Sequence, residues 1–121
     1  MPDAAILLIE DDPHSTRLIS WSLIEHGYSV TAVPSAEEAV ATIDRVKPRV
    51  VIFNTAAPEE QRIREAEELR GRVPSARILD VHDHVVTHCA TDIPADAFLH
   101  KPFDADDLLG TVDRLTSVAK S

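Results

Sequence analysis

The residues with the clearest chemical potential are polar side chains that follow apolar runs of strand length. Three consecutive acids, Glu10, Asp11 and Asp12, come directly after the run AAILLI. A neutral amide, Asn54, follows the run RVVIF, and a positively charged residue, Lys101, stands near the C-terminal end. Because neighbouring carboxylates repel one another, the acidic cluster needs a cation close by. Lys101 is the candidate for that cation, paired either with the acids or with the amide oxygen.

The acids also have a purely structural explanation. The sequence Asp12-Pro13 is typical of a helix start, with Asp12 as the N-cap and Pro13 at the first helical position. Acids close to a helix N-terminus are stabilised by the helix dipole. We therefore assign Asp12 to the cap and keep Glu10 and Asp11 as the candidate acidic pocket.

Five strand-like apolar runs alternate along the chain with segments of helical periodicity. The predicted strands are Ala4–Ile9, Tyr28–Val33, Arg49–Phe53, Ala76–Val81 and Asp96–His100. The predicted helices span residues 13–26, 35–46, 59–72, 84–91 and 104–118, although the pattern over 84–91 is weak. Such βα alternation predicts one parallel sheet with helices on both faces and right-handed crossovers.

This architecture explains why the polar residues belong together. The carboxyl ends of parallel strands meet at one edge of a sheet, and ligands of such sheets bind beyond that edge. The residues that follow a predicted strand are Glu10, Asp11, Asn54, His82 and Lys101. The sequence therefore predicts a single polar site built from strand ends.

Two side-chain patterns in these elements carry further expectations. The first helix should turn one stripe of residues inward, with Trp21 at its edge. This stripe comprises Leu18, Ile19, Ser22 and Leu23. Asp80 lies inside the fourth strand, where a buried carboxylate needs a partner. Its strand parity matches His82, so either His82 or Lys101 is the expected partner, unless the strand ends before Asp80.

Length and composition exclude several classes of protein. The 121 residues suit one domain, covering 1–121. The net charge of −9 argues against nucleic-acid binding, because the phosphates would be repelled. No stretch approaches the roughly 20 apolar residues of a membrane helix. The single cysteine, Cys89, cannot form an internal disulfide, which favours a reducing, cytoplasmic location.

The segments ILLIEDDP, KPRVVIFN and ADAFLHKPFDADDLL together resemble the receiver domain of two-component response regulators. The resemblance covers nearly the whole chain, and its most specific part is Lys-Pro-Phe followed by a capped amphipathic helix. It implies a flavodoxin-like (βα)5 fold, a three-layer sandwich in which helices cover both faces of a five-stranded parallel sheet. It also implies a place in phosphorelay signal transduction.

The resemblance assigns roles by position. In that family an acidic pair and an aspartate after the third strand bind Mg²⁺, and the aspartate accepts a phosphoryl group from a histidine kinase. A Thr or Ser after the fourth strand and a Lys after the fifth contact the phosphoryl group, and a nearby aromatic residue acts as a switch. These positions are Glu10 and Asp11, Asn54, His82, Lys101 and Phe98. Phe98 is alternatively a core residue.

This chain departs from the family pattern where the phosphoryl group would be handled. Asn54 is a carboxamide, which is neutral and a poorer nucleophile than the carboxylate it replaces. The Mg²⁺ site also loses a charge, since this ion prefers anionic oxygen ligands. His82 offers no small hydroxyl group, and the carboxylate of Asp83 would repel a phosphoryl group.

We therefore expect an atypical receiver that works without phosphorylation and without a resident cofactor, through contact with other proteins. We do not expect it to be an enzyme. Its partners would be a histidine kinase or an output protein, and a second copy could dock through the last helix. The alternative is a phosphorylatable receiver in which Asp11 or Asp12 accepts the phosphoryl group with the help of Mg²⁺ and Lys101.

Overall fold

The architecture comes from a computed structural model of the chain. It describes residues 4–54, 58–83, 95–101 and 103–120, with side chains at all of these except 59, 82, 83, 100, 101 and 118–120. The predicted helix over 84–91 lies outside the described residues.

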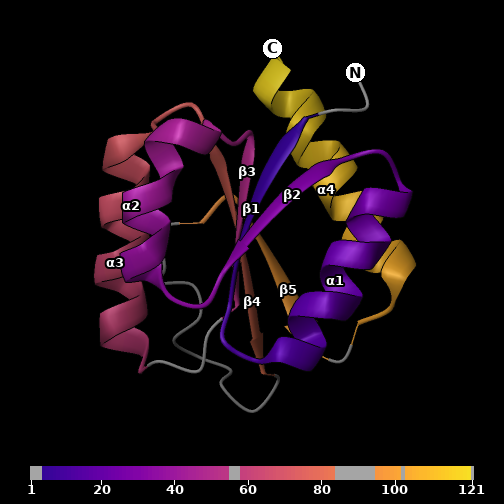
Figure 1. Ribbon diagram of the computed structural model, residues 1–121, viewed down its shortest axis with the longest axis horizontal. Helices are drawn as coiled ribbons and strands as arrows, with labels where there is room; N and C mark the ends of the chain where they lie inside the picture. The colour runs from indigo at the N-terminus through magenta and orange to yellow at the C-terminus, as the bar shows by residue number, and fades with distance from the viewer. Residues whose placement is uncertain (1–3, 55–57, 84–94, 102, 121) are drawn as a thin grey trace.

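A five-stranded parallel sheet forms the centre of the molecule, in the strand order β2-β1-β3-β4-β5 (Figure 1). The strands are β1 (Ala5–Glu10), β2 (Ser29–Val33), β3 (Val50–Asn54), β4 (Arg77–Asp83) and β5 (Ala97–Lys101). The parallel sheet and the five strands confirm the sequence prediction. Four of the strands run one or two residues further than predicted, so that their last residues are polar.

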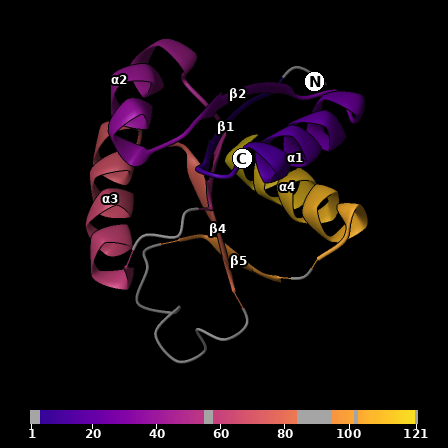
Figure 2. The same ribbon diagram turned by 60° about the horizontal axis from the view of Figure 1, so that its bottom comes forward.

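Helices cover both faces of this sheet. The described helices are α1 (Pro13–Glu25), α2 (Ala36–Val46), α3 (Glu59–Arg72) and α4 (Ala105–Lys120). In two views α2 and α3 lie together on one side, and α1 and α4 lie on the other (Figures 1 and 2). No helix in the described part of the chain is both long enough and apolar enough to span a bilayer.

The central strands β1 and β3 carry apolar side chains on both faces of the sheet, and nearly all of their residues are buried. In β1, Leu7 and Ile9 pack with α2 and α3, whereas Ile6 and Leu8 pack with α1 and α4. All four side chains are fully buried. Continuous apolar runs of this kind are characteristic of strands that are covered on both faces.

Side-chain capping marks the start of three of the four described helices, and the cap of α1 is as predicted from the sequence. The Asp12 carboxylate accepts a hydrogen bond from the backbone N–H of His14, at 3.1 Å, and Pro13 occupies the first turn. Ser35 accepts from the N–H of Glu38, at 3.3 Å. Asp104 accepts from the N–H of Asp107, at 2.8 Å. These bonds satisfy backbone donors that have no partner within the helix.

One prediction about α1 is wrong. Ile19 and Leu23 are buried, but Leu18 is 67% exposed rather than part of the inward stripe. The physical reason is that apolar side chains point in almost every direction around this helix, so periodicity alone does not select the buried face. Trp21, expected at the edge of the stripe, is 63% exposed.

A polar cluster joins the end of α1 and the start of β2 to α4. The Tyr28 hydroxyl donates a hydrogen bond to the Asp113 carboxylate and lies 3.3 Å from the hydroxyl of Thr116. The Nε2 atom of His26 lies 3.0 Å from the other oxygen of Asp113. Partial burial alone would raise the pKa of Asp113, but the hydrogen bonds from Tyr28 and His26 outweigh it and lower that pKa. Burial and the bond to Asp113 raise the pKa of Tyr28.

Because the pKa of Asp113 is lower in the folded protein, its carboxylate stabilises the fold above its usual pKa of 3.8. This contribution is lost as the pH falls through the lowered value. We expect Asp113→Asn to lower the melting temperature at pH 7 by roughly 3–6 °C, as for the loss of about 1 kcal/mol. The difference from wild type should shrink as the pH is lowered below about 4. Thermal unfolding across pH checks this, with the exposed Glu67→Gln as the control; a difference that is independent of pH would contradict it.

Candidate functional site

The sheet brings the predicted site residues to one edge. Glu10, Asn54, Asp83 and Lys101 are the last residues of β1, β3, β4 and β5. In the strand register, Glu10 lies beside Asn54, and Asp83 lies beside Lys101. The predicted gathering of polar residues at the carboxyl ends of the strands is therefore present in the fold.

The centre of this site is a buried contact between Glu10 and Asn54. Only 4% of Glu10 and 3% of Asn54 are exposed. The Nδ2 group of Asn54 donates a hydrogen bond to Oε1 of Glu10. The backbone N–H of Asp12 donates to Oε2 of the same carboxylate, at 3.1 Å. Both oxygens of Glu10 therefore accept hydrogen bonds from neutral donors, and these bonds offset part of the free energy that burial of the carboxylate costs.

The other two acids of the cluster have different surroundings. Asp12 caps α1, and its second carboxylate oxygen accepts a bond from the hydroxyl of Ser15, at 3.3 Å. It is a helix cap, as predicted, and is exposed. Asp11 is also exposed, next to the buried Glu10. The three consecutive acids are thus divided between one buried carboxylate, Glu10, and two at the surface.

This arrangement does not fit a magnesium site. Mg²⁺ binds through anionic oxygens in a near-octahedral geometry. Asn54 turns its amide donor, rather than its oxygen, toward Glu10, and the carboxylate of Glu10 is engaged on both oxygens. Over the described ranges no three His, Cys, Asp or Glu side chains are grouped so that they could hold a metal ion.

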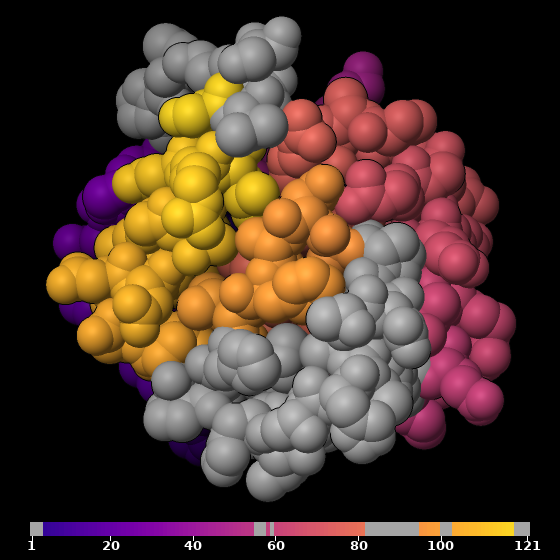
Figure 3. Space-filling model, turned by 180° about the vertical axis from the view of Figure 1, so that it is seen from behind, coloured from indigo at the N-terminus to yellow at the C-terminus, as the bar shows by residue number. Residues whose placement is uncertain are grey.

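Three predicted site residues remain to be placed. The backbones of His82 and Lys101 lie in β4 and β5, but their side chains fall outside the described part, so their predicted phosphate contacts and the pairing of Lys101 with the acids stay predictions. Phe98, on β5, lies beside Asp80 of the neighbouring strand β4. Figure 3 shows β5 at the surface between α4 and α3. With 37% of its surface exposed, Phe98 is not a fully buried core residue.

Asp80 is fully buried, and one of its partners is a residue that sequence reasoning missed. The predicted pairing with His82 or Lys101 stays a prediction, because both side chains lie outside the described part. Arg62 of α3 donates from Nη2 to the Asp80 carboxylate and, at 3.2 Å, to the backbone carbonyl of Val81. The guanidinium carbon of Arg62 lies 5.8 Å from the centre of the Phe53 ring. This ion pair ties α3 to the middle of β4, directly beside the strand that ends at Asn54.

A signal for Arg62 is present in the sequence. Arg62, Ala66 and Leu69 follow one another at helical spacing and are all buried, so Arg62 belongs to the inward stripe of α3. We predicted the partner of Asp80 only among later residues, at His82 or Lys101. An arginine within an apolar stripe, together with an aspartate inside a strand, would have identified the pair.

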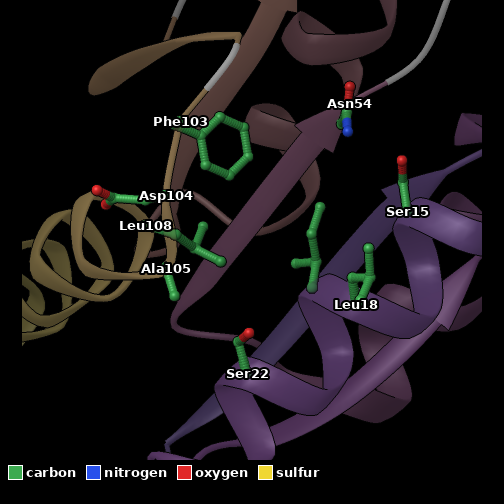
Figure 4. A pocket seen from close by; sticks show the side chains of 9 residues that line it. Ser15, Leu18, Ser22, Asn54, Phe103, Asp104, Ala105 and Leu108 are labelled. Carbon is green, nitrogen blue, oxygen red and sulfur yellow. The ribbon is translucent and has the colours of Figure 1, made fainter.

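A groove between α1 and α4 opens beside residue 54. It encloses about 380 Å³ and is lined mainly by apolar side chains. Phe103 and Leu108 lie on one side, Leu18 lies across from them, and Asn54 and Ser15 lie at one end (Figure 4). Its size and largely apolar lining suit an apolar group rather than a phosphate.

Comparison with known proteins identifies the family of this architecture. Residues 6–113 match the family model described as the response regulator receiver domain. The chain is 29% identical over 118 residues to the transcriptional regulatory protein KdpE of Staphylococcus aureus, covering 96% of this chain and 51% of KdpE. It is 31% identical over 114 residues to GlrR of Escherichia coli, covering 91% of this chain and 26% of GlrR. The chain thus spans about half or less of the length of these curated relatives.

Solved structures show the same fold. The chemotaxis protein CheY4 of Vibrio cholerae superposes with a TM-score of 0.80 at 22% identity, covering 93% of this chain and 98% of CheY4. A CheY-like receiver domain of Methanospirillum hungatei gives a TM-score of 0.82 at 20% identity, covering 98% and 97% of the two chains. The fold class predicted from the sequence, a flavodoxin-like parallel sheet between two helical layers, is confirmed.

The contact between Glu10 and Asn54 predicts a specific response to Asn54→Asp. This change replaces a donor with a second buried carboxylate facing the first, so we expect the free energy of unfolding to fall by roughly 2–4 kcal/mol at pH 7. Acidification below about pH 5 should restore part of the loss, because one carboxylate becomes protonated. Mg²⁺ should stabilise the variant, which regains an anionic ligand, and leave the wild type unchanged.

Urea unfolding with and without Mg²⁺ measures these effects. Asn54→Ala serves as the control, because it removes the hydrogen bond without adding a charge and should not respond to Mg²⁺. Stabilisation of the wild type by Mg²⁺ would show that our interpretation of the donor set is wrong.

The buried ion pair predicts a non-additive mutant cycle. Arg62→Met removes the guanidinium that pairs with the buried Asp80 carboxylate and should lower the free energy of unfolding by about 3–5 kcal/mol. Replacing both residues, as Arg62→Met with Asp80→Leu, should recover most of that loss. Arg64→Met, on the exposed side of the same helix, is the matched control and should change little. If the two single changes simply add in the double variant, measured by urea unfolding, the pair is not coupled as described.

Proposed function

The chain belongs to the response regulator receiver domain family, and from this premise we propose that it is an atypical receiver. In this proposal it takes part in two-component signalling through protein contacts and accepts no phosphoryl group at residue 54. The observation that carries the proposal is the buried Asn54 amide, bonded to Glu10 where the family resemblance calls for an anionic nucleophile.

Chemistry at residue 54 supports this proposal. Attack on a phosphoryl group requires an available anionic oxygen, whereas a carboxamide is neutral and its nitrogen is occupied in donating to Glu10. In the family, Mg²⁺ supplies charge neutralisation during phosphoryl transfer. Since the described donor set does not fit this ion, we propose that the domain has no resident metal and no enzymatic activity of its own.

The surroundings of the site support the same proposal. The nearby groove is lined mainly by apolar side chains, including Phe103 and Leu108, which could receive an apolar side chain from another protein. The net charge of −9 disfavours direct binding to nucleic acid. Protein contact is therefore the mode of action that the surface favours.

The partners proposed for the domain follow from its family. Several relatives are transcriptional regulatory proteins, of which the chain spans about half or less. We propose that this domain, in the cytoplasm, contacts a histidine kinase or an output protein, either as a separate chain or within the same one.

Incubation with acetyl phosphate and Mg²⁺, followed by intact mass measurement, tests the proposal. We expect the mass of the protein to stay unchanged, because residue 54 offers no carboxylate. A receiver that carries aspartate at this position is the control and should gain one phosphoryl group. A gain by this chain would overturn the proposal. If that gain in mass were then lost in Asp11→Asn or in Asp12→Asn, the substituted residue would be the alternative acceptor.

A further inference from the structure

The outward face of α1 carries an unusual concentration of exposed apolar surface. Leu18 is 67% exposed, Trp21 63% and Ile24 55%. Over the described residues, only one other large apolar side chain is classed as exposed, Phe98 on β5. Large exposed apolar groups gathered on one element mark an interaction site more often than scattered ones do.

The charges around this face are arranged symmetrically. Trp21 is at the centre, with Leu18 and Ile24 each three residues away on either side. Arg17 and Glu25 each stand four residues from Trp21, and both are exposed. At 100° per residue, the two members of each pair lie at equal and opposite angles to Trp21 and at equal distances before and after it along the helix axis.

A pattern of this kind is what a self-complementary interface requires. A twofold symmetric dimer uses the same patch on both subunits. Each residue on one side of the axis must therefore meet a complementary residue from the other side. If two α1 helices pack antiparallel about an axis at Trp21, Arg17 lies level with Glu25 of the second copy. A parallel packing would instead bring arginine to arginine and glutamate to glutamate, which is unfavourable.

We propose that the face formed by Arg17, Leu18, Trp21, Ile24 and Glu25 binds a second copy of this chain. The two α1 helices pack antiparallel, with the tryptophans at the twofold axis and two Arg17–Glu25 pairs on either side. Burial of the tryptophan and its apolar neighbours supplies most of the affinity, and the charge pairs select the antiparallel orientation.

The positions of the helices leave this face available. α1 and α4 form the outer layer on one side of the sheet (Figure 2). The last helix, which the sequence suggested as the dimer contact, turns Leu108, Val112 and Leu115 into the core. In its described part α4 exposes no large apolar side chain, so α1 is the better surface for a second copy.

This inference rests on the proposed function, in which the unphosphorylated domain acts by contact with other proteins. A second copy of the chain is then one of those partners. The interface is a single helix pair, so we expect a weak, reversible dimer. Each copy carries a net charge of −9, and the resulting repulsion must be screened. The monomer–dimer equilibrium should therefore be measured at about 0.15 M salt, where the electrostatic screening length is about 8 Å.

Sedimentation velocity over a concentration series of the unphosphorylated protein tests the proposal. We expect a monomer–dimer equilibrium for the wild type. Trp21→Ala should weaken it about tenfold or more, since it removes the central anchor. Glu25→Arg should also weaken it, because it places like charges together, and the combined swap of Arg17→Glu with Glu25→Arg should restore it.

Two control variants separate the interface from general surface effects. Glu67→Arg makes the same change in charge on the exposed side of α3, and Phe98→Ala removes an exposed apolar side chain from β5. Both should dimerise like the wild type. A wild type that is monomeric at every concentration, or a charge swap that fails to restore the dimer, overturns this inference. Neither result bears on phosphoryl transfer at residue 54, which the mass measurement decides separately.

Discussion

The hydrogen bond between Asn54 and Glu10 is the interaction on which the rest of this site depends. Parallel pairing of β1 with β3 places the last residues of both strands side by side, and both side chains are buried. Two carboxylates in that position would repel one another and would need a cation between them. The amide at residue 54 removes the repulsion and donates a hydrogen bond to Glu10.

A second internal pair lies one strand further along. Asp80 lies beside Phe53 in the register of β3 and β4, and it is paired with Arg62 of α3. A buried ion pair of this kind adds little net stability compared with apolar packing, but removing one partner is costly. The region around residue 54 is therefore held by contacts within the chain, and most of the large apolar side chains exposed in the described part of the molecule are on α1, where another protein can reach them.

The sequence predicted the sheet well because its strands are short apolar runs that end in polar residues, and because Asp12, Ser35 and Asp104 are typical N-caps. It failed for Leu18, since α1 carries apolar residues on nearly all sides and only packing against the sheet decides which are buried. The pairing of Asp80 with Arg62 was missed for a different reason. Arg62 stands 18 residues earlier in the chain, and only the crossover of α3 over the sheet brings the two together.

The most direct test of this account is an NMR titration of the ¹⁵N-labelled protein with beryllium fluoride and Mg²⁺, which together mimic a bound phosphoryl group. We expect the backbone amide signals of Glu10 and Asn54, and the side-chain amide signals of Asn54, to keep their positions throughout. Saturable shifts of these signals would mean that the strand ends still bind a phosphoryl-like group, and would contradict the account.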